Sequence, residues 1–382
     1  MNEPARIDQP VRFPGSICIR QRILPQYRAT FFDLLADRCD GELWVVAGAA
    51  NATDSADSER KLQVAKLAPV VNKKSGAGVF TRYTQLGLLE HLQKHAPDVF
   101  VTVPNPRLRD MKKVVRHVRS SGIPAIGWGI GMTEFWNKPL ARLRRMYRER
   151  FVQQFDGMLC YGSRAARQYE QIGFPASRLH PIYNATIAQP GGECPQRPIT
   201  CAGPLKILNV GRLIESKGVD RLIEASAILK SKGIEVEIQI VGDGEDAPRL
   251  KRLADELEAP VVFAGRQSGE ALRKFGLEAD LFVLPGLGGL AIQEAMSFGL
   301  PVIVTEADGT EDDLVRDNGW IVEKENVNAL ADCIESAVGD VTALRKMGEE
   351  SWRIVQEEIN LERMADRFIE GVLEIQKKGL RS

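Results

Sequence analysis

Short apolar runs alternate with amphipathic stretches along most of the chain. Buried strands of a parallel sheet are short and continuously apolar, whereas helices that cover a sheet repeat their apolar positions about every 3.6 residues. The alternation therefore predicts an α/β fold in which a parallel sheet is covered by helices on both faces. In the first half, the expected strands are 16–19, 43–47, 99–103 and 125–128, and the expected helices are 29–39, 84–95 and 107–121.

The second half repeats the alternation from residue 205 onward. Residues 187–204, between the halves, carry proline or glycine at seven positions and are expected to be a linker. A chain of 382 residues is too long for one hydrophobic core. We therefore expect two doubly wound domains that face each other across a cleft. Residues 50–80 are polar and rich in glycine and serine, and we expect a mobile segment over that cleft.

Composition narrows the class of protein. Hydrophobic residues make up 44% of the chain and charged residues 27%, as in ordinary soluble proteins. No apolar run approaches the roughly 20 residues that span a bilayer, and residues 1–15 lack the apolar core of an export signal. The six cysteines are scattered without a CxxC pair, which favours reduced thiols in the cytoplasm and argues against a zinc site.

Charge is divided unevenly between the halves. Residues 1–190 hold 28 Lys/Arg against 16 Asp/Glu, and the remainder holds 23 against 35. Residues 138–152 would form a helix with Leu140, Leu143, Tyr147 and Phe151 on one face and arginines on the other. Two interpretations stay open: a peripheral contact with the inner face of the cell membrane, or an apolar stripe that packs on the sheet below solvated arginines.

Loops that follow the strands of a parallel sheet meet at one edge, where ligands bind. In the first half, Arg28 lies in such a loop and is a candidate for contacting an anionic ligand, although cations at helix starts are often simply solvated. Glu134 follows a glycine-rich stretch and could bind an acceptor hydroxyl or be an ordinary surface carboxylate.

In the second half, residues 281–303 read as a buried strand, a glycine loop at 285–289, a helix and the next strand. Free N–H groups and the helix dipole make such a loop an anion site, although it is also an ordinary connection in α/β domains. Glu294 lies one turn into the helix and could accept bonds from sugar or ribose hydroxyls. Arg212 and Lys217 share a strand-to-helix loop where two cations could clamp a diphosphate.

Several motifs appear in one order: Val-Gly-Arg-Leu-Ile-Glu-Ser-Lys-Gly at 210–218, Ile-Val-Gly-Asp-Gly at 240–244, Phe-Ala-Gly at 263–265, and the glycine loop through Glu294 to 299–303. They resemble the nucleotide-sugar-binding domain of the family 4 retaining glycosyltransferases, also described as glycosyl transferases group 1. The resemblance implies the GT-B fold of two Rossmann-like domains. It would divide the chain into an acceptor-binding domain at 1–190, a donor-binding domain at 191–360, and a helix at 361–382 that returns to the first domain.

The resemblance also implies roles for matching positions. Arg212 and Lys217 would bind the donor diphosphate and stabilise the leaving group without a metal or other cofactor. Glu294 would bind the ribose, and Arg266 would lie near the base. The loop glycines and neighbouring backbone would complete the donor site, and Arg28 and Glu134 would lie on the acceptor side. The donor-contacting backbone positions are Gly211, Gly242, Gly288, Gly289 and Leu290.

One position departs from the family pattern. The family carries a second glutamate, which touches the donor sugar, eight positions before Glu294, and this chain has Gly286 there. The sugar would then be held by loop backbone or near Gln293. We expect a retaining glycosyltransferase that moves a hexose-type sugar from a nucleoside diphosphate to a glycan or lipid-linked acceptor, in surface polysaccharide biosynthesis and without nucleic acid. The alternatives are a nucleotide-binding protein with little activity and a nucleotide-sugar epimerase.

Overall fold

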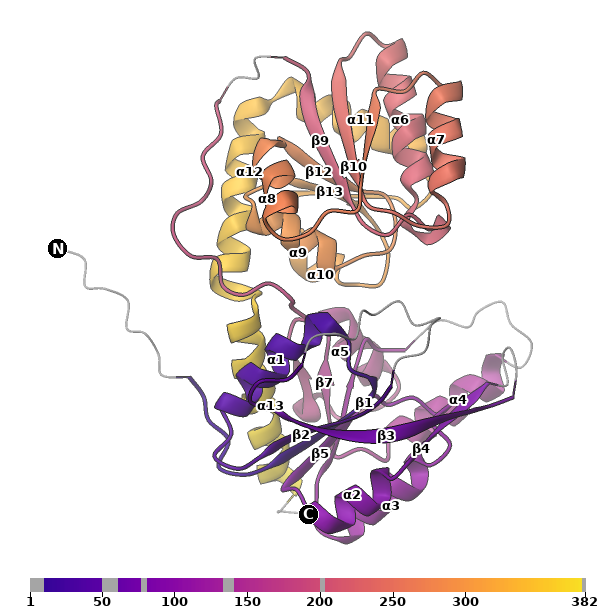
Figure 1. Ribbon diagram of the computed structural model, residues 1–382, viewed down its shortest axis with the longest axis vertical. Helices are drawn as coiled ribbons and strands as arrows, with labels where there is room; N and C mark the ends of the chain where they lie inside the picture. Colours follow the sequence, from indigo (N-terminus) through magenta and orange to yellow (C-terminus); the bar gives the residue numbers. More distant parts are fainter. Residues whose placement is uncertain (1–9, 50–60, 77–80, 133–140, 200–202, 380–382) are drawn as a thin grey trace, which may run out of the picture. The chain divides into compact units, whose positions relative to one another are not determined.

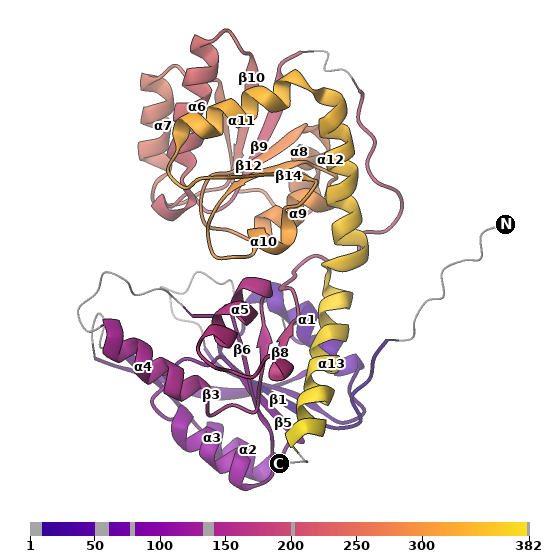
Figure 2. The same ribbon diagram turned by 180° about the vertical axis from the view of Figure 1, so that it is seen from behind.

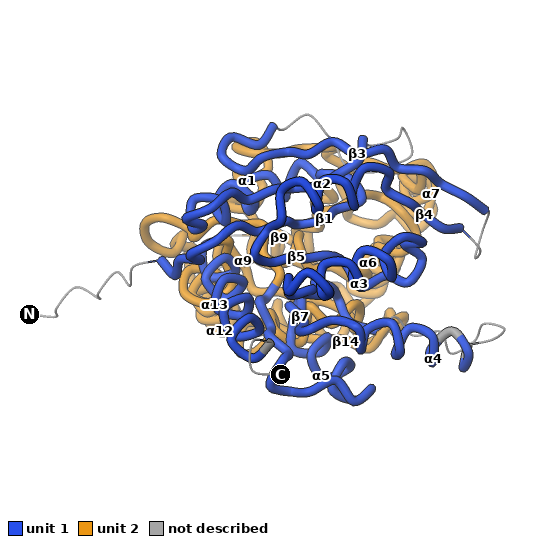
Figure 3. The backbone as a smooth tube through the Cα atoms, turned by 90° about the horizontal axis from the view of Figure 1, so that it is seen from below, with its two compact units in different colours: residues 1–183, 362–382 blue, residues 184–361 orange. Residues whose placement is uncertain are grey.

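The computed structural model describes residues 10–49, 61–76, 81–132, 141–199 and 203–379. The chain forms two compact units, one of Met1–Tyr183 with Glu362–Ser382 and one of Asn184–Leu361 (Figure 3). The units therefore divide between residues 183 and 184 and again between 361 and 362, beside the limits of 190/191 and 360/361 expected from the sequence.

An eight-stranded sheet forms the centre of the first unit, in the order β4-β3-β2-β1-β5-β6-β7-β8 (Figure 1). Neighbouring strands are parallel except β3 and β4, which are antiparallel. The carboxyl ends of β1, β2 and β5 share one edge, because Arg20 of β1 is paired with Val46 and with Thr102. The strands are β1 (Ile17–Ile23), β2 (Leu43–Gly48), β3 (Lys66–Ser75), β4 (Arg82–Leu86), β5 (Val99–Thr102), β6 (Ala125–Gly129), β7 (Gly157–Cys160) and β8 (Leu179–Pro181).

Strand β3 corrects the expectation of a mobile segment at 50–80. Within the described residues 61–76, Lys66–Ser75 extends the sheet from β2. Ala68 and Val70 point into the core while their neighbours Leu67 and Val71 are exposed, which is the period-two pattern of a strand. The prediction was wrong because this short alternation lies in a lysine-rich, polar composition.

Strand β4 corrects the helix expected at 84–95. Arg82–Leu86 pairs antiparallel with β3, with Leu86 opposite Val71, so the parallel sheet has an antiparallel edge strand. Gly87 then adopts a φ of 96°, and helix α2 runs only from Leu88 to His95. A left-handed residue ends a strand at little cost when it is glycine, which fixes the boundary.

Helices cover both faces of this sheet. Apolar side chains of α2, α3, α4 and α5 pack in one core cluster that also contains Phe100 of β5. On the other face, α13 lies beside α1 (Figure 2). The ring centroid of Phe368 on α13 lies 5.8 Å from that of Phe31 on α1 and 5.6 Å from that of Trp128. The helices are α1 (Gln26–Asp37), α2, α3 (Met111–Ser120), α4 (Ala141–Val152), α5 (Ser163–Gln171) and α13 (Leu361–Gly379), with a 3-10 turn at Ala176–Arg178.

Helix α4 differs from the packed stripe that was one of the two interpretations of 138–152. Phe151 is buried, but Leu143 is 60% and Tyr147 46% exposed. Leu140 lies outside the described residues. The amphipathic pattern therefore identified a helix but placed too many of its apolar side chains against the sheet.

The second unit has a six-stranded sheet of parallel strands in the order β11-β10-β9-β12-β13-β14. Its core joins the sheet to α6, α7, α11 and α12. The strands are β9 (Leu205–Val210), β10 (Val236–Val241), β11 (Val261–Gly265), β12 (Leu281–Leu284), β13 (Val302–Thr305) and β14 (Gly319–Val322). The helices are α6 (Val219–Ser231), α7 (Ala247–Glu256), α8 (Glu270–Glu278), α9 (Leu290–Ser297), α10 (Glu311–Leu314), α11 (Val327–Gly339) and α12 (Val341–Arg353), with a 3-10 turn at Glu215–Lys217 and a π-helical turn at Ile354–Glu358.

Arg197 fixes the expected linker to this unit. Its guanidinium donates to the carbonyl oxygens that end α8 and α9, including Ala279 O at 2.7 Å and Phe298 O at 2.9 Å. Burial lowers the pKa of Arg197 to about 10. The contacts satisfy helix-end carbonyls that lack partners within their own helices.

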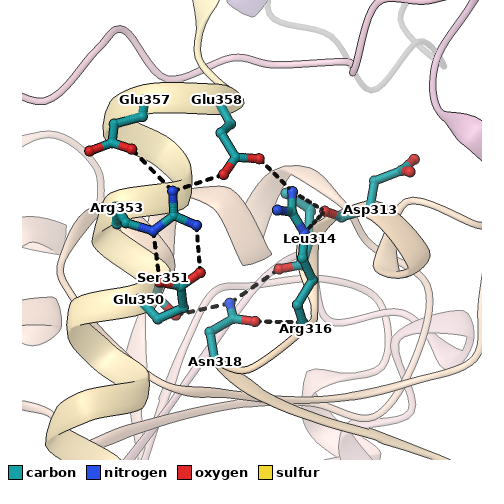
Figure 4. Close-up of polar contacts among 9 residues, drawn as sticks. All are labelled: Asp313, Leu314, Arg316, Asn318, Glu350, Ser351, Arg353, Glu357 and Glu358. Atoms are coloured by element: carbon teal, nitrogen blue, oxygen red, sulfur yellow. Dashed lines mark hydrogen bonds and ion pairs between the residues drawn. The ribbon is translucent and has the colours of Figure 1, made fainter.

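A polar network holds the end of α12 to the turn before β14 (Figure 4). Asn318, which is fully buried, donates to Ser351 Oγ at 3.1 Å. The Glu358 carboxylate pairs with two arginines: Oε1 lies 3.0 Å from Arg353 Nη1, and Oε2 lies 2.8 Å from Arg316 Nη2. The network fixes the region that follows β13, where a loop of the candidate site begins.

Within the described ranges, no helix is long and apolar enough to cross a membrane.

Candidate functional site

Four loops meet at the carboxyl edge of the second unit's sheet. They follow β9 at 211–218, β10 at 242–244, β12 at 285–289 and β13 at 306–310. This edge is where open α/β sheets bind ligands, because strand ends and helix N-termini converge there.

The first two loops touch through backbone atoms. A Cβ on Gly242 would overlap the carbonyl oxygen of Gly211, so only glycine fits at 242. The N–H of Gly242 donates to Gly265 O at 2.8 Å, which places the end of β11 and the exposed Arg266 beside this turn. The structure thus brings Gly211, Gly242 and Arg266 together at the edge, with the exposed Arg212 following Gly211 in the same loop.

Lys217 connects the first loop to the glycine loop. Its ammonium donates to the carbonyl oxygen of Leu287 and lies 2.8 Å from where a Cβ on Gly288 would be. Burial lowers the pKa of Lys217, and the negative charge of Asp308 opposes that shift. A partly desolvated cation beside a glycine loop interacts more strongly with an anion than the same cation in water does.

Gly286 has no room for a side chain. A Cβ there would lie 2.6 Å from Ser216 O and closer still to the carbonyl group of Lys217. The N–H of Leu287 also donates to Ser216 O at 2.9 Å, which ties the two loops together. The glutamate that the family carries at this position is therefore replaced by a backbone contact, and adding a carboxylate would require the loops to separate.

The side chain of Gln293 binds backbone groups of its own unit. Its side chain is fully buried, its amide nitrogen donates to Asn184 O, and its amide oxygen accepts the N–H of Thr186 at 3.2 Å. Both ends of the amide therefore bind the unit's own backbone. The Gln293 side chain itself is therefore turned away from a ligand by the helical register, and how the sugar is held stays a prediction.

Glu294, the next residue, is only partly buried. Burial nevertheless raises the pKa of its carboxyl group. Helix α9 begins at Leu290, directly after Gly289, so the unpaired N–H groups of its first turn lie at the glycine loop one turn before Glu294. A carboxylate and a helix N-terminus can bind hydroxyls and an anion of the same ligand.

The fourth loop, which is rich in acidic residues, adds side chains that were not among the expected site residues. A Cβ on Gly289 would lie 2.6 Å from the side chain of Thr310, and the Thr310 hydroxyl donates to Asp308 Oδ1 at 2.6 Å. Glu311, 2% exposed, accepts the N–H groups of Ala307 and Gly309. In the sequence, this loop is indicated by the pair Asp308-Gly309, which follows the buried strand β13.

The candidates of the first unit do not form a comparable cluster. Arg28 is 4% exposed, and its guanidinium carbon lies 5.1 Å from the ring centroid of Trp128 and 5.6 Å from that of Tyr161. Such cation–π contacts stabilise a buried arginine. The expected contact with an anionic acceptor thus falls on a side chain enclosed by its own unit. Glu134 lies outside the described residues.

No group of three or more metal-binding side chains is found among the residues that the structure describes. The charged groups at the edge of the second sheet include Arg212, Lys217, Arg266, Glu294 and Asp308, and the cations could neutralise an anionic ligand directly.

Known proteins resemble the chain in sequence. A profile described as glycosyl transferases group 1 matches residues 199–352. The amylovoran biosynthesis glycosyltransferase AmsK of Erwinia amylovora is 38% identical over 141 residues, which are 34% of each chain. The putative colanic acid biosynthesis glycosyltransferase WcaL of Escherichia coli K12 is 34% identical over 199 residues, 48% of each chain. The matches thus span between a third and a half of these relatives.

The fold resembles solved structures over almost the whole chain. The lipopolysaccharide outer core galactosyltransferase WaaB superposes with a TM-score of 0.70 at 15% identity, covering 94% of this chain and 99% of that one. Anabaena Alr3699/HepE in complex with UDP gives a TM-score of 0.68 at 17% identity, with the same coverage of 94% and 99%. Residues 199–352 thus match the glycosyl transferases group 1 family, and the chain as a whole has the GT-B fold of two α/β units.

Proposed function

We propose that this chain transfers a hexose-type sugar from a nucleoside diphosphate to a hydroxyl of a glycan or lipid-linked acceptor, with retention of configuration, in the synthesis of a surface polysaccharide. The relatives in amylovoran and colanic acid biosynthesis support the setting. The structure bound to UDP supports a nucleotide donor.

One observation carries the proposal: Lys217, in the loop after β9, reaches the glycine loop at the N-terminus of α9. Its ammonium binds Leu287 O beside Gly288, and Glu294 lies one turn into the same helix. When the bond from the anomeric carbon to the diphosphate breaks, negative charge develops on the diphosphate. A cation and helix N–H groups already in place would stabilise that charge in the transition state.

The same arrangement would need no metal, because Arg212 and Lys217 provide the positive charge that a divalent cation would otherwise supply. Glu294 would accept hydrogen bonds from the ribose hydroxyls, and Arg266 would lie near the base, next to the turn at Gly242. Activity should then persist after dialysis against a strong chelator.

The direct test is a calorimetric panel of UDP, GDP, ADP and their common sugar conjugates, followed by transfer assays with the conjugate that binds. Selective binding of one nucleotide and release of that nucleoside diphosphate when an acceptor is added are the expected results. The anomeric configuration of the product, read by NMR, tests retention. Isomerised sugar nucleotide without acceptor would indicate an epimerase, and binding without turnover would indicate a nucleotide-binding protein.

We also propose that α3 and α4 contact an anionic membrane surface. Leu143, Met146 and Tyr147 are 60%, 40% and 46% exposed and share one face of α4 at i, i+3 and i+4 spacing. The Lys112 ammonium lies 4.5 Å from the Tyr147 ring, which connects this face to α3. Exposed cations surround it: Lys112, Lys113 and Arg116 on α3, and Arg142, Arg145 and Arg150 on α4.

Apolar side chains among cations suit the interface of a bilayer that contains acidic phospholipid. The apolar groups enter the headgroup region, and each nearby lysine or arginine adds about 1 kcal/mol of electrostatic attraction. The protein would then encounter a lipid-linked acceptor at the membrane that contains it.

A further inference from the structure

Gly286 leaves the candidate site without the carboxylate that the family pattern has at this position, and the loops leave no space to restore it. The backbone of residues 285–287 is held against 216–217 by the bond from Leu287 N–H to Ser216 O. Arg221 adds a bond to Pro285 O at 3.2 Å. A group that holds the donor sugar must therefore come from another element.

The loop after β13 brings a different carboxylate to the glycine loop. Thr310 packs its side chain against Gly289, where α9 begins. Asp308 accepts both the N–H of Thr310 at 3.1 Å and its hydroxyl at 2.6 Å, so its carboxylate is held beside that contact. Both bonds use Oδ1, which leaves Oδ2 able to accept hydrogen bonds from a ligand.

The loop itself is rigidly built around Asp308. The buried carboxylate of Glu311 accepts Ala307 N–H at 2.7 Å and Gly309 N–H at 2.9 Å, the two residues that flank Asp308. Gly309 has a φ of 94°, a conformation that favours glycine and turns the chain back toward α10. Asp308 itself is exposed. A side chain fixed by such a turn loses little conformational entropy when it binds a ligand.

Asp308 and Lys217 are also electrostatically connected. The charge of Asp308 acts on the partly buried Lys217 ammonium. The contacts described for them are from the Lys217 ammonium to Leu287 O and from Thr310 to Asp308 Oδ1, so both charges remain able to bind one ligand near them. A cation on one side and a carboxylate on the other match a sugar diphosphate, which carries anionic oxygens at one end and hydroxyl donors at the other.

We propose that Asp308 is a specificity-determining residue that binds a hydroxyl of the donor sugar, in place of the glutamate that Gly286 excludes. The inference rests on the proposed function and deepens it. Asp308 contributes to recognition of the sugar, and Lys217 and the α9 N-terminus contribute to recognition of the diphosphate. Asp308 is a positioning group for the sugar and takes no part in bond making or breaking.

The test compares wild type with Asp308→Asn and Asp308→Glu, and with Glu306→Gln as a control on an exposed carboxylate in the same loop. Calorimetry measures the affinity of each protein for the preferred nucleoside diphosphate alone and for its sugar conjugate. For Asp308→Asn we expect a loss of about tenfold or more for the conjugate and a change within about twofold for the nucleoside diphosphate. Asp308→Glu should recover part of the affinity, and Glu306→Gln should match wild type.

Steady-state kinetics separates a structural role from sugar recognition. Asp308→Asn should raise the KM for the donor with an unchanged melting temperature. Equal losses for the nucleoside diphosphate and its conjugate, or no loss for either, would overturn the role of Asp308 while leaving the proposed function intact if wild type still transfers sugar. A wild type that binds none of the sugar nucleotides would overturn both.

Discussion

Arg38 Nη1 lies 2.6 Å from Asp366 Oδ1, an ion pair that joins the end of α1 to α13 across more than three hundred residues of sequence. The side chains of Arg38 and Asp366 are only 7% and 19% exposed, and Arg38 also donates to Glu362 O at 3.0 Å. The pair fixes the last helix to the first unit, although the second unit lies between them in the chain.

Asp366→Ala should destabilise the first unit by about 3 kcal/mol, because the substitution leaves a buried guanidinium without its partner. Urea unfolding followed by tryptophan fluorescence measures the loss, fitted with a separate transition for each unit if two are seen. The matched control is Asp40→Ala, which breaks the exposed pair with Arg12 and should cost less than about 1 kcal/mol. Equal effects would contradict the structural role of α13.

Gly286→Ala should destabilise the second unit by about 1–3 kcal/mol, because its methyl group would overlap the backbone of Ser216 and Lys217. The same variant should weaken nucleotide binding by displacing Lys217. Gly339→Ala is the control, since a Cβ at that position meets no atom within 4 Å. Thermal unfolding and calorimetry on both variants measure the two effects, and a stable Gly286→Ala protein would show that the loops separate easily.

Lys217→Ala should lower kcat/KM for the donor by roughly 10²–10³-fold, the usual effect of removing one preorganised group that stabilises developing charge. Arg212→Ala should also reduce turnover severely. Lys232→Ala removes a lysine that pairs on the surface with Asp332 and Glu335, and it should leave the rate unchanged. Turnover like that of wild type in both Lys217→Ala and Arg212→Ala would exclude the proposed diphosphate clamp.

Glu294 should make stability depend on pH. Burial raises the pKa of this carboxyl group, so the folded protein holds its proton to a higher pH than the unfolded chain does. Its contribution to stability is therefore largest at acid pH, and is lost as pH rises from the ordinary glutamate range through the raised pKa.

Glu294→Gln should remove the loss of stability at rising pH and so raise the melting temperature near pH 7. The same substitution should weaken the binding of the nucleoside diphosphate. Calorimetric unfolding of wild type and variant from about pH 4 to pH 8 measures the difference. Glu256→Gln, on an exposed carboxylate of α7, should leave the profile as in wild type. Parallel pH profiles for wild type and Glu294→Gln would contradict the assignment.

The α3–α4 surface should bind vesicles that contain phosphatidylglycerol, and should bind pure phosphatidylcholine vesicles weakly. Added salt should reduce the binding, because acidic headgroups attract the cations electrostatically. Leu143→Ser with Tyr147→Ser should lower the partition coefficient by about tenfold. A control with Leu257→Ser and Leu277→Ser changes exposed leucines of the second unit. Equal flotation of both double variants would reject this surface.

Much of the second unit was predictable because its strands are continuously apolar and its turns carry glycine. Leu281–Leu284 and Val302–Thr305 are buried strands as expected, and Gly299 follows α9, where its φ of 68° is suited to a helix end. Parallel strands buried on both faces leave little ambiguity in the sequence pattern.

The first unit was harder to predict because its edge strands carry few apolar residues. In β3, only Ala68 and Val70 are buried among lysines, and β4 runs antiparallel to it. The exposure of Leu143 and Tyr147 also depended on which elements pack against α4, a property that no local pattern contains.

The sequence by itself determined the two α/β halves, the glycine loops and the positions of Lys217 and Glu294, because these follow from local periodicity and from residue types with special backbone freedom. Only the tertiary structure decided that the backbone of Ser216 and Lys217 leaves no room for a side chain at Gly286, and that Gln293 faces inward. It also decided that Thr310, which donates to Asp308, packs against Gly289 at the start of α9. Those outcomes depend on how loops far apart in the chain pack at one sheet edge, where separations of a few ångströms decide which side chains fit.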